Sequence, residues 1–218
     1  MTQGFTLWFT GLSGAGKSTL SQAVADVARW LESGMVVVIS GRSNPDAFAS
    51  IRNAAPGADA GILVPPDGYL KGVREICDRY GIMMICDEVM SGFGRTGEWF
   101  AVNHWNVVPD MLVMAKGLTS AYVPLGAVGM RRGLADRFDS NVYWGGLTYN
   151  SHPLACAAAL ATMDVLEREG IRNAETVGAH IMQRISAWPQ NYEMVGDVRG
   201  RGLMIGVELV TDKKSKAP

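Results

Sequence analysis

The fold is decided by two short stretches, IMMICD (82–87) and MLVMAK (111–116), in each of which an apolar run ends at a charged residue. Short, unbroken apolar runs are typical of strands buried on both faces of a parallel sheet. Asp87 ends the first stretch and Lys116 ends the second. Because ligands of such sheets bind beyond the carboxyl ends of the strands, we expect a carboxylate and an amine at one ligand-binding edge of an α/β protein.

An acid and an amine placed in this way suit the chemistry of pyridoxal 5'-phosphate (PLP). A lysine can hold the PLP aldehyde as a Schiff base, while an acid keeps the pyridine nitrogen protonated. The pair therefore predicts a PLP-dependent enzyme in which Lys116 is catalytic and Asp87 binds the cofactor. Each residue also has an ordinary interpretation. Asp87 could be a plain strand-end acid, and Lys116 could be a lysine that extends from a strand end to water.

The composition argues against several other classes of protein. Of the 218 residues, 48% are hydrophobic and 19% are charged, as in a soluble globular protein, and the net charge of −1 gives no electrostatic reason to bind nucleic acid or an anionic membrane. No apolar run approaches the roughly 20 residues of a membrane span, and no secretory signal is expected. The three cysteines, Cys77, Cys86 and Cys156, lack metal-site spacing, so we expect reduced thiols in a cytoplasmic protein.

Apolar periodicity and turn residues predict alternating strands and helices along the chain. Gly34 and Gly81 are expected to end helices, because glycine readily adopts the left-handed conformation that follows a helix. Residues 43–60 have no clear period, so we interpret them as a junction. The expected strands are 5–9, 36–39, 82–87, 111–116, 125–130 and 203–210, and the expected helices are 20–31, 70–80, 153–168 and about 173–188.

A phosphate-binding pattern, G-x-x-x-x-G-K-[ST], is matched at every fixed position by GLSGAGKS (11–18). Such a glycine-rich backbone wraps a phosphate, the lysine reaches terminal phosphates and the hydroxyl holds Mg²⁺. A glycine-rich turn without a function is the alternative. The candidate nucleotide-phosphate ligands are Gly11, Gly14, Gly16, Lys17, Ser18 and Thr19, and Ser18 is also the candidate Mg²⁺ ligand.

The stretch GFTLWFTGLSGAGKSTL (4–20) closely resembles adenylylsulfate kinases, and the resemblance covers residues 1–42. It implies a P-loop that binds ATP with Mg²⁺. In that family the second strand is followed by an Asp-containing segment that serves substrate and metal. Here Ser40-Gly41-Arg42 follows the expected strand, with no acid at that place. A P-loop ATP-binding protein is therefore an alternative function for the chain.

Four ordered blocks carry a second resemblance, to class III (ω-amino acid) aminotransferases, over residues 57–218. These blocks are GILVPPDGYLKGVREICDRYGIMMICDEVMSGFGRTGEWFA (61–101), PDMLVMAKGLTSAYVPLGAV (109–128), GLTYNSHPLACAAAL (146–160) and VRGRGLMIGVEL (198–209).

This second resemblance implies a role for each site residue. Lys116 would form the Schiff base and move a proton between substrate and cofactor, and Asp87 would pair with the pyridine nitrogen. Val89 would pack on a face of the ring. Thr148 would bind the cofactor phosphate from the neighbouring subunit, which implies a homodimer. Val89 as plain core and Thr148 as a helix cap before Pro153 are the alternatives.

The resemblances imply a mainly parallel sheet flanked by helices, as in the large domain of a PLP-dependent transferase of fold type I, preceded by a P-loop strand–loop–helix unit. The implied reaction moves an amino group between an ω-amino acid or amine and a 2-oxo acid such as pyruvate. We expect a P-loop segment at 1–42, a junction at 43–60, a large-domain segment at 61–190 and the start of a small C-terminal domain at 191–218.

Three family features have no match in this sequence. They are a Gly-Ser phosphate loop, an aromatic residue that stacks on the ring, and a C-terminal arginine for a substrate carboxylate. An incomplete, inactive aminotransferase and a non-catalytic chimera or remnant are therefore further alternatives.

Overall fold

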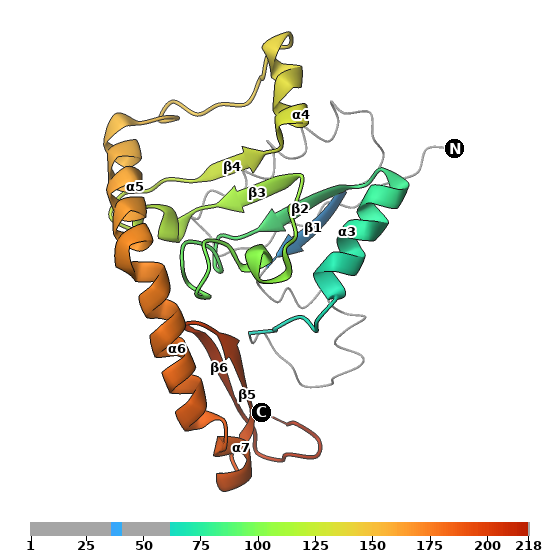
Figure 1. Cartoon of the computed structure of the whole chain (residues 1–218), viewed down its shortest axis with the longest axis vertical. Coiled ribbons are helices and arrows are strands. Elements are labelled where there is room, and N and C mark those ends of the chain that lie inside the picture. Colours follow the sequence, from blue (N-terminus) through green and yellow to red (C-terminus); the bar gives the residue numbers. More distant parts are fainter. Residues whose placement is uncertain (1–35, 41–61, 218) are drawn as a thin grey trace.

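The computed structural model describes residues 62–217 and the backbone of the strand at 36–40. Figure 1 shows a central sheet, a long helix beside it and a small two-stranded sheet below. The expected strand at 5–9, the expected helix at 20–31 and the phosphate-binding pattern at 11–18 lie outside the described residues. None of the described helices is long and apolar enough to cross a membrane.

The central sheet has the strand order β1-β2-β3-β4. Strands β1 and β2 pair in parallel, and so do β2 and β3, which confirms the expected parallel arrangement for these three strands. Strand β4, in contrast, is antiparallel to β3. A parallel pairing needs a long crossover connection, usually a helix, whereas residues 115–126 contain only the short 3₁₀ turn η2. The bounds are β1 Val36–Ser40, β2 Met83–Asp87, β3 Met111–Met114, β4 Ala127–Met130 and η2 Lys116–Thr119.

The side chains of β2 alternate between two hydrophobic clusters, one on each face of the sheet. Met83 and Ile85 pack with Met111 and Val113 of β3 on one face. On the other face, Met84 and Cys86 pack against Leu70 and Cys77 of helix α3 (Tyr69–Tyr80). This alternation is the period of two that a strand imposes. Burial raises the pKa of the Cys86 thiol to about 12, so this free thiol stays protonated.

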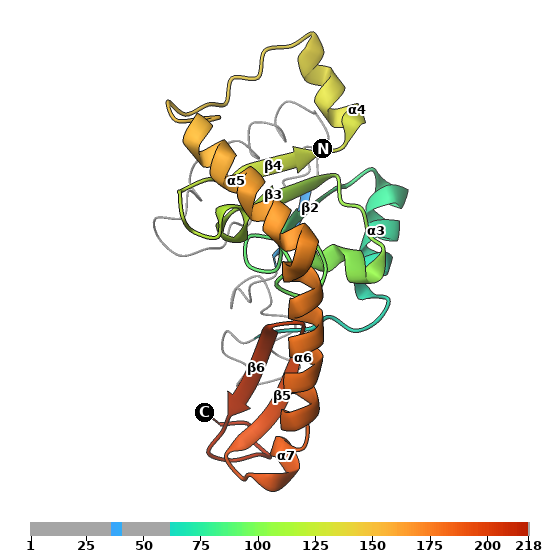
Figure 2. The same cartoon turned by 60° about the vertical axis from the view of Figure 1, so that its left-hand side comes forward.

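Helix α3 confirms the expected helix at 70–80, and Gly81 ends it in the left-handed conformation with a φ of 64°. Two other expected helices, 153–168 and 173–188, are in fact one continuous helical rod. Helix α5 (Pro153–Val165) passes through the π turn η4 (Leu166–Gly170) directly into α6 (Ile171–Ile185). Gly170 keeps a helical backbone there, with a φ of −64°. Figures 1 and 2 show the rod running from beside the central sheet to the small sheet.

The small sheet is an antiparallel hairpin of β5 (Val195–Arg201) and β6 (Met204–Leu209), preceded by the short helix α7 (Trp188–Asn191). Strand β6 confirms the expected strand at 203–210, whereas β5 was not expected because its sequence, VGDVRGR, contains few apolar residues. The hairpin turn lies directly on α6. A Cβ atom added at Gly178 would be 2.1 Å from the carbonyl oxygen of Gly202, so only glycine fits there.

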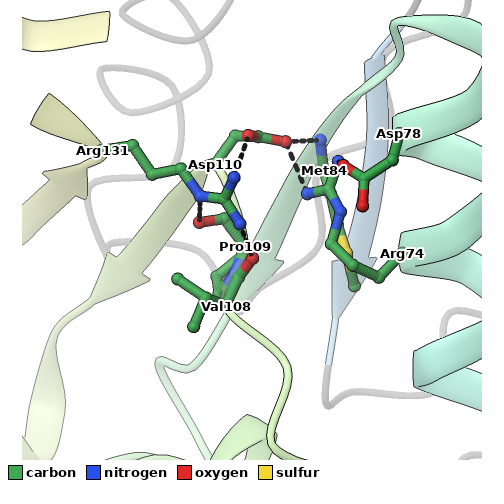
Figure 3. Close-up of polar contacts among 7 residues, drawn as sticks. All are labelled: Arg74, Asp78, Met84, Val108, Pro109, Asp110 and Arg131. Carbon is green, nitrogen blue, oxygen red and sulfur yellow. Dashed lines mark hydrogen bonds and ion pairs between the residues drawn. The ribbon is translucent and has the colours of Figure 1, made fainter. Parts of the chain in front are cut away.

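A cluster of charged residues ties the amino ends of β2 and β3 to their neighbours (Figure 3). Asp110, just before β3, accepts hydrogen bonds through Oδ2 from Arg74 Nη1 of α3 at 2.6 Å and from the backbone N–H of Met84 at 2.8 Å. Its Oδ1 lies 3.6 Å from Arg131 Nη1, beside the end of β4. The Arg74 and Asp110 side chains are only 12% and 17% exposed. One carboxylate therefore links a helix and three strands.

We expect Asp110→Ala to lower the free energy of unfolding by about 2–3 kcal/mol, because it leaves Nη1 of the largely buried Arg74 and the Met84 amide without their acceptor, while Arg74 Nη2 keeps only its ion pair with the exposed Asp78. Urea denaturation measures the change. The control is Asp136→Ala, which removes an exposed ion pair with Arg132 at 4.0 Å and should alter the free energy by no more than about 0.5 kcal/mol. Equal effects of the two variants would contradict the role given to Asp110.

Candidate active site

The structure places Asp87 and Lys116 at the same edge of the central sheet. Asp87 is the last residue of β2, and its partner in the adjacent parallel strand is Val113. Lys116 follows Val113 by three residues, just beyond the end of β3. Figure 1 shows β2 and β3 ending on the side of the sheet that faces α5. The carboxylate and the amine therefore reach one edge from neighbouring strands.

Lys116 does not end β3 as expected but begins η2, two residues after the last residue of the strand. Its backbone has a φ of 48°, a left-handed conformation that costs a non-glycine residue roughly 1–2 kcal/mol. The side chain is exposed, and Nζ donates a hydrogen bond to Sδ of Met90 at 2.5 Å. Such strained conformations persist where the surrounding structure holds them, and they are concentrated at functional sites.

The turn that carries Lys116 is held by close packing of Gly117 on Phe93. A Cβ atom added at Gly117 would lie 2.8 Å from Cβ of Phe93, closer than real Cβ atoms approach. Phe93 also has a left-handed backbone, with a φ of 58°, and belongs to a buried cluster with Leu118 of η2 and Ala159 of α5. The position of Lys116 therefore depends on a glycine next to it and on an aromatic ring from the preceding loop.

Asp87 is partly buried, and its Oδ1 accepts a hydrogen bond from the backbone N–H of Val89 at 3.0 Å. Val89 packs against the cluster that contains Met83 and Ile85, on the same face of the sheet. The contacts of Val89 agree with its interpretation as core, and its half-buried side chain still borders the edge at which β2 ends.

Glu88, next to Asp87, is a buried acid that sequence reasoning did not place in the site. It is 2% exposed, and its Oε1 accepts a hydrogen bond from the N–H of Val102 at 2.9 Å. Its Oε2 accepts a hydrogen bond from the Ser91 hydroxyl. Burial raises the pKa of Glu88, and the hydrogen bonds from Ser91, Val102 and Ala101 oppose that shift. The position of Glu88 in the sequence could have indicated its burial, because it follows Met84 and Cys86 at intervals of two residues and so shares their buried face of the strand.

Thr148 is exposed, in a turn between η3 (Asp136–Asp139) and α5. Figure 1 shows this connection passing above the central sheet from the region of α4 (Arg132–Ala135) to the start of α5. The helix begins at Pro153 with His152 at its N-cap and no side-chain hydrogen bond to the cap. The interpretation of Thr148 as the cap of this helix is therefore wrong. Because proline has no backbone N–H, Pro153 adds no unpaired donor to the first turn that a cap would have to satisfy.

The other predicted ligands, Gly11, Gly14, Gly16, Lys17, Ser18 and Thr19, lie outside the described residues.

We expect Gly117→Ala to lower the free energy of unfolding by about 1–3 kcal/mol, because the new methyl group must displace Phe93 or η2. Gly133→Ala is the matched control, since nothing lies within 4 Å of a Cβ atom there and alanine favours its helix by up to about 1 kcal/mol. Thermal or urea denaturation compares the two. A Gly117→Ala protein as stable as the parent would show that Lys116 does not depend on this contact.

Comparison with known proteins identifies the family of the chain. The family model described as aminotransferase class-III matches residues 32–217, and the one described as adenylylsulphate kinase matches residues 3–42. The first match covers most of the chain, so the protein belongs to the class III aminotransferase family. This confirms the resemblance seen in the four sequence blocks.

Relatives in this family include proteins of different activities. The chain is similar to an uncharacterized aminotransferase, YhxA, of Bacillus subtilis, with 45% identity over 72% of this chain and 36% of the relative. It is also similar to a leucine/methionine racemase of Thermococcus litoralis, with 42% identity over 78% of this chain and 38% of the relative. The chain thus spans less than half the length of these relatives.

Among solved structures, the fold is similar to that of taurine:2-oxoglutarate aminotransferase from Bifidobacterium kashiwanohense in complex with PLP and glutamate. The TM-score is 0.74 with 31% sequence identity, covering 95% of this chain and 45% of that chain. The described α/β architecture is therefore that of a class III aminotransferase segment, as the sequence predicted.

Proposed function

We propose that this chain carries the lysine and the ring-nitrogen acid of a PLP-dependent aminotransferase. The observation that supports this function is the placement of Asp87 and Lys116 at the carboxyl edge of two adjacent parallel strands, with Lys116 held in a left-handed conformation. The reaction would transfer an amino group between an ω-amino acid or amine and a 2-oxo acid such as pyruvate. The similarity to an enzyme that acts on taurine, an ω-amino compound, supports that substrate class.

The residues present fit PLP, because an exposed primary amine and a half-buried carboxylate reach one edge from neighbouring strands. When bound, PLP supplies an electron sink for the carbon that carries the amino group. Lys116 would hold the cofactor aldehyde and then carry a proton to and from the substrate carbon. Asp87 would keep the ring nitrogen protonated, with its own carboxylate oriented by the Val89 N–H, and Val89 would border one face of the ring.

Thr148 would bind the cofactor phosphate of a second copy, so the proposed assembly is a homodimer. The segment around Thr148 supports this proposal because it exposes large apolar side chains, which soluble proteins usually cover with a partner. Trp144, in this segment, is 85% exposed. The other exposed large apolar residues of this segment are Val142, Tyr143, Leu147 and Tyr149.

PLP added to the purified chain should give the visible absorbance band of lysine-bound cofactor, and Lys116→Ala should abolish it. Lys71→Ala, which removes an exposed lysine from α3, is the control and should keep the band. An amine donor with pyruvate should then give alanine, whereas a racemase would interconvert amino acid enantiomers without consuming pyruvate. A band that survives in Lys116→Ala would refute the assignment.

A homodimer should appear in sedimentation velocity as a concentration-dependent shift from one to two chains. Trp144→Ser should weaken the association about tenfold or more, the effect of losing a buried aromatic contact of over 1.4 kcal/mol. Tyr80→Ser is the control. It replaces another exposed aromatic residue, at the end of α3, and should leave the strength of association unchanged. A chain that stays monomeric at all concentrations, or equal effects of both variants, would contradict the proposed interface.

A further inference from the structure

The alternation of side chains in β2 continues past its last residue and separates Asp87 from Glu88. Val89 packs with the cluster of Met83 and Ile85 on one face of the sheet. Glu88 contacts Val102, which belongs to the cluster of Met84 and Cys86 on the opposite face. The two neighbouring acids therefore lie on opposite faces of the sheet, and only Asp87 lies on the same face as Val89.

The Glu88 side chain fastens a distant segment to this point. Val102 belongs to the 3₁₀ turn η1 (Ala101–Trp105), and its N–H donates to Oε1 while Ser91 donates to Oε2. The Ala101 N–H donates to the same carboxylate. Among the described residues Glu88 has no ion-pair partner, so these three donors are what compensates the desolvation of its carboxylate. A carboxylate with several such bonds makes charge-assisted contacts that fix geometry strongly.

The backbone of Glu88 is fixed as well. Its N–H donates to the carbonyl oxygen of Val113 in β3 at 2.9 Å, and its own carbonyl oxygen accepts from Gly92 N–H at 2.9 Å. A Cβ atom at Gly92 would lie 2.8 Å from that oxygen, so the turn admits only glycine without a shift. The residues on either side of Glu88 are joined to each other, since Asp87 Oδ1 accepts from Val89 N–H at 3.0 Å. Holding the backbone of Glu88 in place therefore also holds the hydrogen bond between Asp87 and Val89 in place.

We propose that Glu88 is a positioning residue of the PLP site, which sets the Asp87 carboxylate and Val89 by anchoring the turn after β2 to η1. This inference rests on the proposed function for its connection to PLP. Glu88 itself faces away from Asp87 and acts through the backbone of its two neighbours. The competing possibility is that Glu88 only fastens η1, with no influence on Asp87.

The test compares Glu88→Ala with Glu88→Gln in the full chain. Alanine removes all three contacts, while glutamine is isosteric: its oxygen can accept from the Ala101 and Val102 amides, and its amide group can donate to Ser91. The first readout is hydrogen exchange at the backbone amides of Val89 and Val102 without PLP. The second is the dissociation constant of PLP, measured by absorbance.

In Glu88→Ala, exchange at both amides and the PLP dissociation constant should each rise about tenfold or more, the effect of losing a hydrogen bond to a buried charged group. The Ile85 amide, inside β2, should keep its protection. Glu88→Gln should restore all these values to within about threefold of the parent. Asp87→Asn should weaken PLP binding without changing exchange at Val102.

If exchange rises at Val102 but not at Val89, Glu88 only fastens η1 and the proposal is overturned. A parent chain that binds no PLP would refute the proposed function instead, and exchange at Val89 would then decide the positioning role alone. If Glu88→Ala does not fold, Ser91→Ala removes one donor and should raise exchange at both amides to a smaller extent. Unchanged exchange at Val89 in that variant would overturn the proposal.

Discussion

The parallel pairing of β2 with β3 is the constraint on which the candidate site depends. Its register sets Asp87 opposite Val113, so that the chain leaves both strands at the same edge. A shift of one residue would turn every side chain of β2 to the other face and exchange the places of Asp87 and Glu88. The apolar residues on both faces prevent such a shift, because Met83 and Ile85 belong to one cluster while Met84 and Cys86 belong to the other.

The two ends of this strand pair have different roles, one structural and the other in presenting the site residues. At the amino ends, Asp110 accepts hydrogen bonds from Arg74 and Met84, and the Asp110 N–H donates to the Met84 carbonyl oxygen. At the carboxyl ends the chain turns sharply, through the left-handed residue Lys116 and the packed glycine Gly117. Paired charges therefore fix the register at one end, and strained turns present polar groups at the other. This division is common where a rigid scaffold positions reactive side chains on loops.

Local patterns were sufficient to predict the elements that position the site. The apolar runs at 82–87 and 111–116, and the helix ended by Gly81, are each encoded within a few neighbouring residues. Strand β5 could not be predicted in this way, because charged residues and glycines interrupt its apolar pattern and it is a strand through its pairing with β6.

The site, like the fold, was predictable from the sequence only in part. The sequence placed Asp87 and Lys116 at one edge through a general property of parallel sheets. It did not indicate the contact of Glu88 with Val102 or that of Gly117 with Phe93, because the partners are many residues apart and meet only in the folded chain. The continuous rod of α5 and α6 was missed for a different reason. Gly170 weakens the local helical pattern, whereas Leu166 of η4 packs against the cluster that contains Phe93 and Leu118.

The most direct test of this account is to reduce the PLP-treated chain with borohydride, which fixes the cofactor to the amine that holds it, and to map the labelled peptide by mass spectrometry. The account predicts a single pyridoxyl group on Lys116, at the edge that it shares with Asp87. A label on Lys71 or Lys213, or one distributed over several exposed lysines, would contradict the claim that the strand pair builds a PLP site.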